Sequence, residues 1–207
     1  MHFLSVKNEG KPAESFLFKH GIAPGEQDSV VWSALQSGNR RALHYIFEKY
    51  VRLLYAYGNK ITKDYGIVED GIQDLFVELW RKHEVLGSTD NIRLYLLKSL
   101  RRKIVRRIDS DHRKLGTESL QEENATEVEL SVEASMIQQQ FSIEQQEQLT
   151  RAISNLSERQ REAVYLKFYE KMDYQQLSKV LEISLTSSYK LIGKAVDALR
   201  KSMRVMR

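Results

Sequence analysis

The sequence contains no cysteine, and this absence excludes disulfide bonds, thiolate metal sites and cysteine nucleophiles together. Only 2 of the 207 residues are proline and 10 are glycine, which favours helices joined by few sharp turns. No apolar run approaches the roughly 18 residues needed to cross a bilayer, and the first residues have no apolar core of signal-peptide length. We therefore expect no membrane insertion and a cytoplasmic location.

The residue types of common active sites are present but scattered. There is no glycine-rich phosphate loop, no GxSxG motif and no pair of carboxylates at strand ends. The histidines have no metal-ligand spacing, and they are His2, His20, His44, His83 and His112. We therefore expect a protein that is not an enzyme, with no catalytic residue, metal or cofactor.

Charge alternates along the chain, although the net charge is only +4. Residues 98–114 contain 8 Lys or Arg against 2 Asp, and residues 115–148 contain 8 Glu and no basic residue. Residues 149–207 are again basic, with 12 Lys or Arg against 6 acids. This alternation indicates two modules that face nucleic acid, separated by a spacer that repels it.

Helical periodicity dominates and no strand pattern competes with it, so the predicted class is all-α. We expect two small helical domains joined by a flexible acidic linker. The predicted boundaries are an N-terminal extension over 1–26, a first domain over 27–110, a linker over 111–140 and a second domain over 141–207.

Four helices are predicted in the first domain, beginning with a short one around Trp32. Asn39 can cap the second, and Gly66 separates it from the third. A loop over 82–90 then leads to a fourth helix over about 91–108, for which Asp90 is a plausible cap.

The third helix, EDGIQDLFVELWRK, carries a core-forming stripe at i, i+3, i+4 and i+7: Ile72, Leu75, Phe76 and Leu79. Glu69 and Asp70 are expected at its N-terminus, where the helix dipole stabilises acids. Trp80, with carboxylates one and two turns back, either forms a docking surface for a basic partner helix or covers the core.

The fourth helix, IRLYLLKSLRRKIVRRI, is densely basic, through Lys98, Arg101, Arg102, Lys103, Arg106 and Arg107. Cations at this density repel one another unless phosphates or acids neutralise them. The stripe therefore favours nucleic-acid binding over a merely solvated face. Tyr95 beside it either stacks on an unpaired base or packs in the core.

The segment 156–199 is typical of a helix-turn-helix. Ser157 and Asp173 can each cap a helix, each with a glutamine three residues on as in a capping box. After a break at Glu182, Ser184 can open a last helix, whose polar face carries Thr186, Ser187, Tyr189, Lys190 and Lys194. Hydroxyls near a helix start and lysines along its side suit a DNA major groove, although a solvated face has the same composition.

With both modules described, the chain resembles the extracytoplasmic-function group of bacterial sigma factors, the smallest two-domain sigma subunits of RNA polymerase. The resemblance covers about residues 28–108 and 141–203. In the first module it is carried by ALHYIFEKYVRLLY, EDGIQDLFVELW and YLLKSLRRKI, and in the second by LSERQREAVYLKFYEKMDYQQLSKVLEIS and the helix after it.

The resemblance implies roles for individual residues. The helix that docks on the polymerase clamp is matched by Asp70, Gln73, Asp74, Phe76, Leu79 and Trp80. The loop over 82–90 matches the segment that captures a flipped base of the −10 element. The surface that holds the melted strand is matched by Tyr95, Lys98, Arg101, Arg102, Lys103 and Arg106. The helix that reads the −35 element is matched by Ser184, Thr186, Ser187, Ser188, Tyr189, Lys190 and Lys194.

The resemblance also implies a function and partners. It implies a subunit that directs core RNA polymerase to promoter DNA and assists promoter melting, and that is held by an anti-sigma partner. The chain departs from the family's common pattern at Arg102 and Arg106, where asparagine and aspartate are common, and at Glu182, where a glycine often makes the turn. Two other functions remain open from the residues alone: a free-standing helix-turn-helix regulator, and an RNA-binding helical protein.

Overall fold

The computed structural model describes residues 28–114 and 143–205, and within them every regular element is helical. The prediction of an all-α class is confirmed. The described residues form two compact units, one from residues 28–59 and 64–103 and the other from residues 60–63, 104–114 and 143–205. The predicted extension over 1–26 and most of the predicted linker over 111–140 lie outside the described residues.

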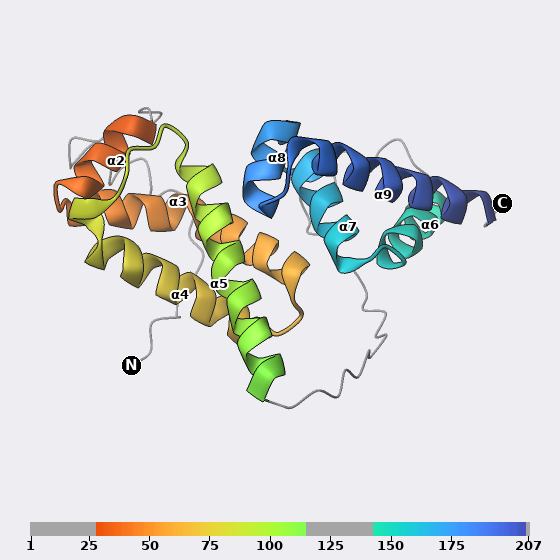
Figure 1. The fold of residues 1–207 in the computed structure, drawn as a ribbon, viewed down its shortest axis with the longest axis horizontal. Helices are drawn as coiled ribbons and strands as arrows, with labels where there is room; N and C mark the ends of the chain where they lie inside the picture. Colours follow the sequence, from red (N-terminus) through yellow and green to blue (C-terminus); the bar gives the residue numbers. More distant parts are fainter. Residues whose placement is uncertain (1–27, 115–142, 206–207) are drawn as a thin grey trace. The chain divides into compact units, whose positions relative to one another are not determined.

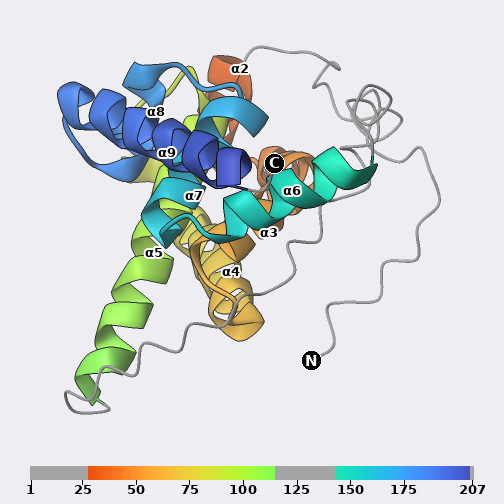
Figure 2. The same ribbon diagram turned by 90° about the vertical axis from the view of Figure 1, so that its right-hand side faces the viewer.

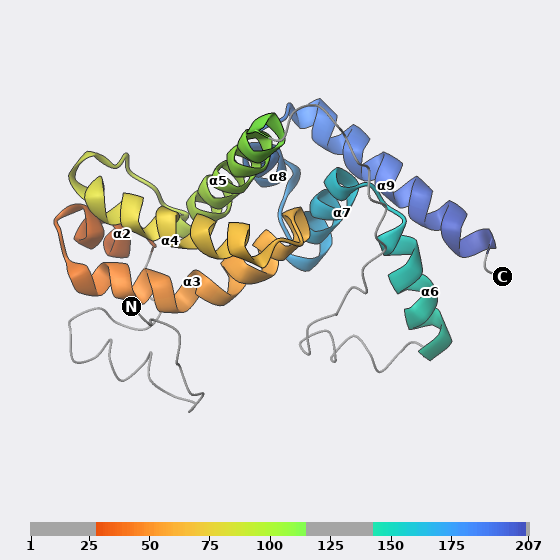
Figure 3. The same cartoon turned by 90° about the horizontal axis from the view of Figure 1, so that it is seen from below.

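The first unit is built from helices α2 (Asp28–Gln36), α3 (Arg40–Ile61), α4 (Tyr65–Arg81) and the beginning of α5 (Ile92–Lys114), with a short 3-10 helix, η1 (His83–Val85), between the last two. Helices α3 and α4 lie side by side and α5 crosses them (Figures 1 and 3). Leu96, Leu97 and Leu100 of α5 are fully buried, and each contributes about 1.5 to 3 kcal/mol through the hydrophobic effect.

Helix α4 begins a full turn before its predicted start near Glu69. The Asp64 side chain caps it by accepting hydrogen bonds from the backbone N–H groups of Gly66 and Ile67, at 2.9 and 3.2 Å. Gly66 therefore lies in the first turn, where its low helix propensity matters less than the cap. Glu69 and Asp70 stand in the second turn, so the interpretation that they stabilise the helix N-terminus is wrong.

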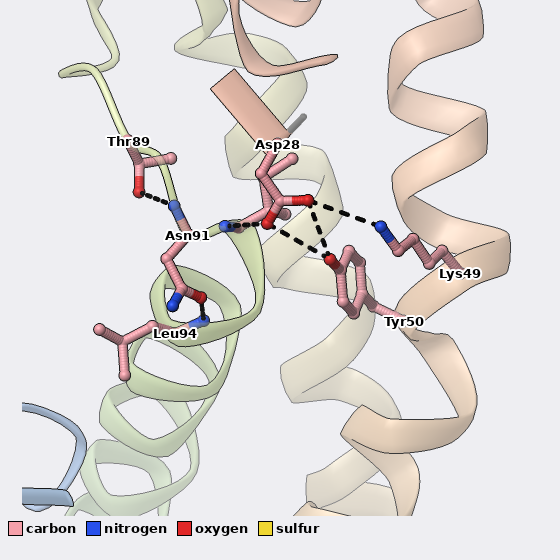
Figure 4. Close-up of polar contacts among 7 residues, drawn as sticks. Asp28, Lys49, Tyr50, Thr89, Asn91 and Leu94 are labelled. Carbon is pink, nitrogen blue, oxygen red and sulfur yellow. Dashed lines mark hydrogen bonds and ion pairs between the residues drawn. The ribbon is translucent and has the colours of Figure 1, made fainter. Parts of the chain in front are cut away.

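The N-terminus of α5 is held by two side chains (Figure 4). Asn91, and not the predicted Asp90, accepts a hydrogen bond from Leu94 N–H at 2.8 Å. The Asp28 carboxylate, at the start of α2, accepts from Ile92 N–H at 2.8 Å and lies 3.5 Å from the Lys49 ammonium. The other end of α5 was also predicted too short, because the helix continues to Lys114 and takes in the first residues of the predicted linker.

Helices α4 and α5 are joined by an ion-pair cluster centred on Glu78. Its two carboxylate oxygens accept hydrogen bonds from Lys103, on α5, at 2.6 Å and from Lys82 at 2.5 Å. These bonds stabilise the ionised carboxylate and lower the pKa of Glu78 from 4.5 to about 2.

The second unit contains α6 (Ile143–Ser154), α7 (Glu158–Val164), η4 (Tyr165–Tyr169), α8 (Tyr174–Leu181) and α9 (Leu185–Val205). Helices α6, α7 and α8 all pack against α9 (Figures 1 and 2). Both predicted capping boxes are formed, Ser157 with Gln160 and Asp173 with Gln176. A π turn at η4 extends α7, which the periodicity did not predict.

The turn between α8 and α9 is made by a residue in the left-handed conformation. Glu182 closes α8 with φ 54° and ψ 47°, and its N–H donates to Ser178 O. Left-handed geometry costs a residue that has a Cβ roughly 1–2 kcal/mol. The backbone thus adopts the glycine-type turn although the residue is glutamate.

We expect Lys103→Met to raise the pKa of Glu78 back toward 4.5, measured by NMR titration of its carboxyl carbon. Because the folded pKa is depressed, the pair stabilises the protein above about pH 4.5, and this stabilisation is lost as pH falls through about 2. The Glu78 side chain is 39% exposed, so the loss of stability at neutral pH should be only on the order of 0.5 kcal/mol. Arg102→Met removes a neighbouring cation and is the control; an equal rise there would contradict the assignment.

At the turn, Glu182→Gly should be more stable than Glu182→Ala by about 0.5 to 1 kcal/mol, measured by urea denaturation. Both variants lack the carboxylate. The difference between their free energies of unfolding is therefore the cost of the left-handed backbone for alanine, reduced by the larger entropy that glycine loses on folding. The matched pair at Lys179, inside α8, should show the opposite order, with alanine favoured by about 1 kcal/mol. Equal stabilities at Glu182 would mean that its backbone is not left-handed in solution.

Candidate nucleic-acid and protein interfaces

One exposed face of α4 is acidic. Asp70, Gln73 and Asp74 are all exposed, at spacings that place them along one side of the helix. Val77, which follows on the same side, is 59% exposed although it is apolar. We call these four residues the acidic α4 face. Sequence reasoning did not select Val77, and the available signal was an apolar residue outside the core-forming stripe.

Two of the residues matched to the clamp-docking helix are core residues. Leu79 is 1% exposed and Phe76 is 8% exposed, with the Phe76 ring edge-to-face against Phe47 of α3 at 5.0 Å. A side chain this buried cannot present a contact area to another protein. The prediction that Phe76 and Leu79 bind polymerase directly is therefore corrected: they support the helix from beneath.

Trp80 packs on its own domain while remaining half-buried. Its indole stacks on the imidazole of His83 with centroids 4.9 Å apart, and the Arg40 guanidinium lies 5.6 Å from the ring centroid. Such contacts hold the ring at the end of α4. Of the two roles that the sequence left open, the covering of the domain is observed, and the residue stays partly accessible at the end of the same helix.

The basic residues of α5 differ in how accessible they are. Arg102, Arg106 and Arg107 are exposed, whereas Lys98 and Arg101 are half-buried. Arg107 pairs with Asp111 one turn on, at 3.3 Å. The Lys103 side chain is 23% exposed and bonds Glu78, so a phosphate would have to displace that carboxylate. The predicted strand-binding surface is thus centred on Arg102 and Arg106 and is weaker at Lys103.

Tyr95 lies at the N-terminal end of this basic surface and is half-buried. Its ring meets that of Trp32 edge-on, with centroids 4.8 Å apart. Burial raises the pKa of the Tyr95 hydroxyl above its ordinary value of 10.0, so the group stays neutral and can donate a hydrogen bond. The core packing is therefore observed, and Tyr95 also stays partly accessible.

The beginning of α9 presents the predicted polar face. Thr186, Ser187, Lys190 and Lys194 are exposed. Ser184 caps the helix as predicted, because its hydroxyl accepts a hydrogen bond from Ser187 N–H at 3.0 Å. The helix N-terminus carries a partial positive charge, which adds to the attraction of the lysines for phosphate.

Ser188 does not belong to this face. It is 0% exposed, and its hydroxyl donates to the carbonyl of Leu185 at 2.6 Å. A helix turns about 100° per residue, so the position directly after Ser187 points into the domain. The prediction that Ser188 contacts DNA is therefore corrected.

An aromatic stack next to the α9 face escaped sequence reasoning. Tyr189, 53% exposed, stacks on Tyr174 of α8 with centroids 3.9 Å apart. The Lys167 ammonium lies 4.4 Å from the Tyr174 ring centroid. A shallow hollow is lined by Lys167, Asp173, Tyr174, Gln175, Leu185 and Tyr189. Lys167 lies in η4, Tyr174 in α8 and Tyr189 in α9. Because only the tertiary fold brings these elements together, no local motif could have indicated the stack.

The described part of the chain shows no group of three or more His, Asp or Glu side chains that could hold a metal ion. Among the helices over 28–114 and 143–205, none is both long and apolar enough to span a membrane. The three surfaces carry carboxylates on α4, guanidinium groups on α5, and hydroxyls with lysines on α9.

Comparison with known proteins gives two family matches. Residues 46–114 match the model of sigma-70 region 2, and residues 146–199 match that of sigma-70 region 4. The first match contains the acidic α4 face and the whole of α5, and the second contains the helix-turn-helix segment 156–199. Together they cover more than half of the chain.

Individual proteins similar to this chain match it over almost their whole length. The ECF RNA polymerase sigma factor SigK of Mycobacterium ulcerans (strain Agy99) is 20% identical over 183 residues, 87% of this chain and 96% of that protein. The fold is similar to that of the sigma factor RpoE solved with the anti-sigma factor NepR from Bartonella quintana, with a TM-score of 0.58 at 18% identity, covering 78% of this chain and 96% of that one. CnrH, solved with the cytosolic domain of CnrY, has a TM-score of 0.55 at 19% identity, covering 86% and 97%. Since region 2 precedes region 4 on one chain of this length, the chain belongs to the sigma-70 family of RNA polymerase sigma factors, in the extracytoplasmic-function group.

Proposed function

We propose that this sigma factor directs core RNA polymerase to specific promoters through the three surfaces described above, and assists the opening of the promoter DNA. The observation that carries the proposal is the presence, on one chain, of a region 2 match with an acidic exposed helix face and a region 4 match with a basic one. No observation favours a free-standing regulator, which would need no helix for polymerase.

The acidic α4 face is the proposed contact with polymerase. Asp70 and Asp74 supply charge, Gln73 supplies hydrogen bonds, and Val77 supplies an apolar contact at the C-terminal end of the face. This composition suits a basic partner helix with an apolar side chain at its centre. The half-buried Trp80 lies at the end of the same helix and adds a preformed aromatic anchor.

The α5 surface is the proposed contact with the melted strand of the −10 element. Arg102 and Arg106 reach phosphates, with Lys98 and Arg101 contributing from half-buried positions. The half-buried Tyr95 lies at the N-terminal end of this surface and contacts an unpaired base. The loop over 82–90 captures a flipped base, and these contacts offset the few kcal/mol that unpairing costs per base.

The α9 face is the proposed contact with the −35 element. Thr186, Ser187 and Lys190 lie in the first two turns, where the recognition helix of a helix-turn-helix meets base edges. Lys190 also reaches a backbone phosphate, as does Lys194 one turn further on. Tyr189 stacks on Tyr174, so its ring contacts the DNA in a fixed orientation.

Further elements of the proposal rest on relatives. The RpoE and CnrH structures were solved with NepR and with the cytosolic domain of CnrY, and we extend this kind of anti-sigma partner to the present chain. The protein works in the cytoplasm and forms no bond itself, because polymerase supplies the catalysis.

The first test is co-elution with bacterial core RNA polymerase on size exclusion at moderate salt. The wild-type protein should co-elute stoichiometrically, and the double variant Asp70→Lys, Asp74→Lys should not, because reversed charges at a close interface cost several kcal/mol. Asp197→Lys reverses an exposed acid of α9 and is the matched control, expected to co-elute.

Two results would count against this interface. Co-elution of the double variant would move the contact away from the acidic α4 face. Loss of its helical circular dichroism or melting transition would show that the two acids are structural. A wild-type protein that fails to co-elute with intact polymerase would contradict the sigma function itself.

The second test concerns promoter fragments that the wild-type holoenzyme selects from genomic DNA. Lys190→Ala with Lys194→Ala should weaken holoenzyme binding and reduce the slope of log K against log salt by about 1.8, since each phosphate contact contributes about 0.9. Polymerase binding should be unchanged. Arg200→Ala with Lys201→Ala removes the same charge further along α9 and should leave the slope near the wild-type value. Equal slopes for the two double variants would show that the effect is general charge and not the α9 face.

A further inference from the structure

Helix α2 bonds the backbone of the segment that leads from η1 into α5. The Trp32 indole N–H donates to the carbonyl of Gly87 at 2.8 Å, and the Gln36 side-chain amide donates to the carbonyl of Leu86 at 2.6 Å. At the other end of the segment, Asp28 accepts from Ile92 N–H at 2.8 Å (Figure 4). These are contacts across 50 to 64 residues of sequence.

The three side chains lie on one face of the helix, because Asp28, Trp32 and Gln36 are spaced by four residues, about one turn. Trp32 is 1% exposed and its ring also contacts Tyr95, so its indole N–H has a fixed direction. Asp28 is held in turn by Lys49 and by the Tyr50 hydroxyl, which lies 3.4 Å from one carboxylate oxygen. The Trp32 donor and the Asp28 acceptor are thus oriented by contacts with other helices, independently of the segment that they bond.

The residue that follows α2 and its turn also meets the beginning of the segment. Gly38 has φ +80°, and a Cβ there would lie 3.2 Å from the imidazole Nε2 of His83 in η1. A side chain at this position would be strained by its backbone and would press on His83. The end of α2 and the side of η1 therefore approach closely, independently of the three hydrogen bonds.

Each of the three bonds goes to a main-chain group and none to a side chain of the segment. The path of residues 86–92 is therefore set by α2, whatever side chains the segment carries. Ser88 and Asp90, between the bonded points, are exposed, and nothing would meet a Cβ at Gly87 within 4 Å. The side of the segment that faces α2 is therefore held by hydrogen bonds, while its opposite side is exposed.

We propose that Asp28, Trp32 and Gln36 are positioning residues for base selection: they hold the 86–92 backbone in the path that lets the loop over 82–90 recognise an unpaired base. This inference rests on the proposed function, in which that loop meets the melted −10 strand. Discrimination between bases depends on hydrogen bonds placed to within about half an ångström, so a loosened backbone loses selectivity before it loses charge-driven affinity.

The test uses holoenzyme, made from the full chain and core polymerase, and a pool of single-stranded DNA with a randomised centre. Bound DNA is sequenced, and the preference for the best base over the others is taken at the most selective position. Gln36→Met keeps the length of the side chain but removes the donor, and Trp32→Phe keeps a buried ring but removes the indole N–H. Each should lower the preference roughly 2- to 10-fold, the range expected for one lost hydrogen bond, while the total DNA retained changes less than about twofold.

Two further variants separate positioning from general stability. Gln36→Lys restores a donor and should return the preference toward wild type. Ser33→Ala removes a hydrogen bond within α2 itself, from the Ser33 hydroxyl to Ser29 O, and should leave the preference unchanged. Polymerase co-elution should be the same for all four variants.

The inference is overturned if Gln36→Met and Trp32→Phe both keep the wild-type preference. It is also overturned if retained DNA, melting temperature and preference fall in parallel, or if Ser33→Ala lowers the preference as much as Gln36→Met. If the wild-type holoenzyme forms but shows no base preference, the loop does not select a base and the inference is wrong, whereas the sigma function still stands. A wild-type chain that does not bind polymerase overturns the proposed function first and the inference with it.

Discussion

Each helix of this protein has to bury one face, and that requirement decides which residues are available to a partner. On α4 the buried face takes Phe76 and Leu79, so the acidic α4 face is what remains. On α9 it takes Ser188, although serine is a polar residue. Motif matching assigned all three to interfaces because it follows positions along the sequence. Whether a residue is buried depends instead on the side of the helix on which it lies, because burial of apolar surface contributes about 25 cal/mol per Å².

Helix ends show how far local chemistry could be predicted. Ser157, Asp173 and Ser184 cap helices by accepting hydrogen bonds from the N–H groups three residues on, and their patterns indicated those helix starts correctly. The starts of α4 and α5 were misplaced because Asp64 and Asn91 are followed by residues that complete no capping box. The extra acceptor at α5, Asp28, lies 64 residues earlier and could not be found by any local pattern.

The charges of α5 show a similar division. Their density predicted a need for neutralising groups, and part of that need is met within the protein. Asp111 pairs with Arg107 at i+4, a spacing that a sequence displays directly. Glu78 pairs with Lys103 across 25 residues, and this pair required the crossing of α4 and α5. Lys103 is held by Glu78, whereas Arg102 and Arg106 are exposed, and these are the two positions of α5 where the chain departs from the family's common residues.

In the proposed function, the distribution of hydrogen bonds gives the two DNA-facing surfaces different structural support. On α9 the reading side chains stand on a helix whose own backbone is satisfied internally, so their placement needs only a cap and a packed core. The segment over 86–92 has mostly irregular backbone, and its carbonyl and N–H groups need partners from elsewhere. Asp28, Trp32 and Gln36 supply three of them from one face of one helix. Irregular backbone can follow the outline of a single flipped base, which a straight helix cannot, and its order then depends on α2. Helix α2 contributes no residue to the proposed DNA contacts, but it is linked through the main chain to the segment that leads into α5.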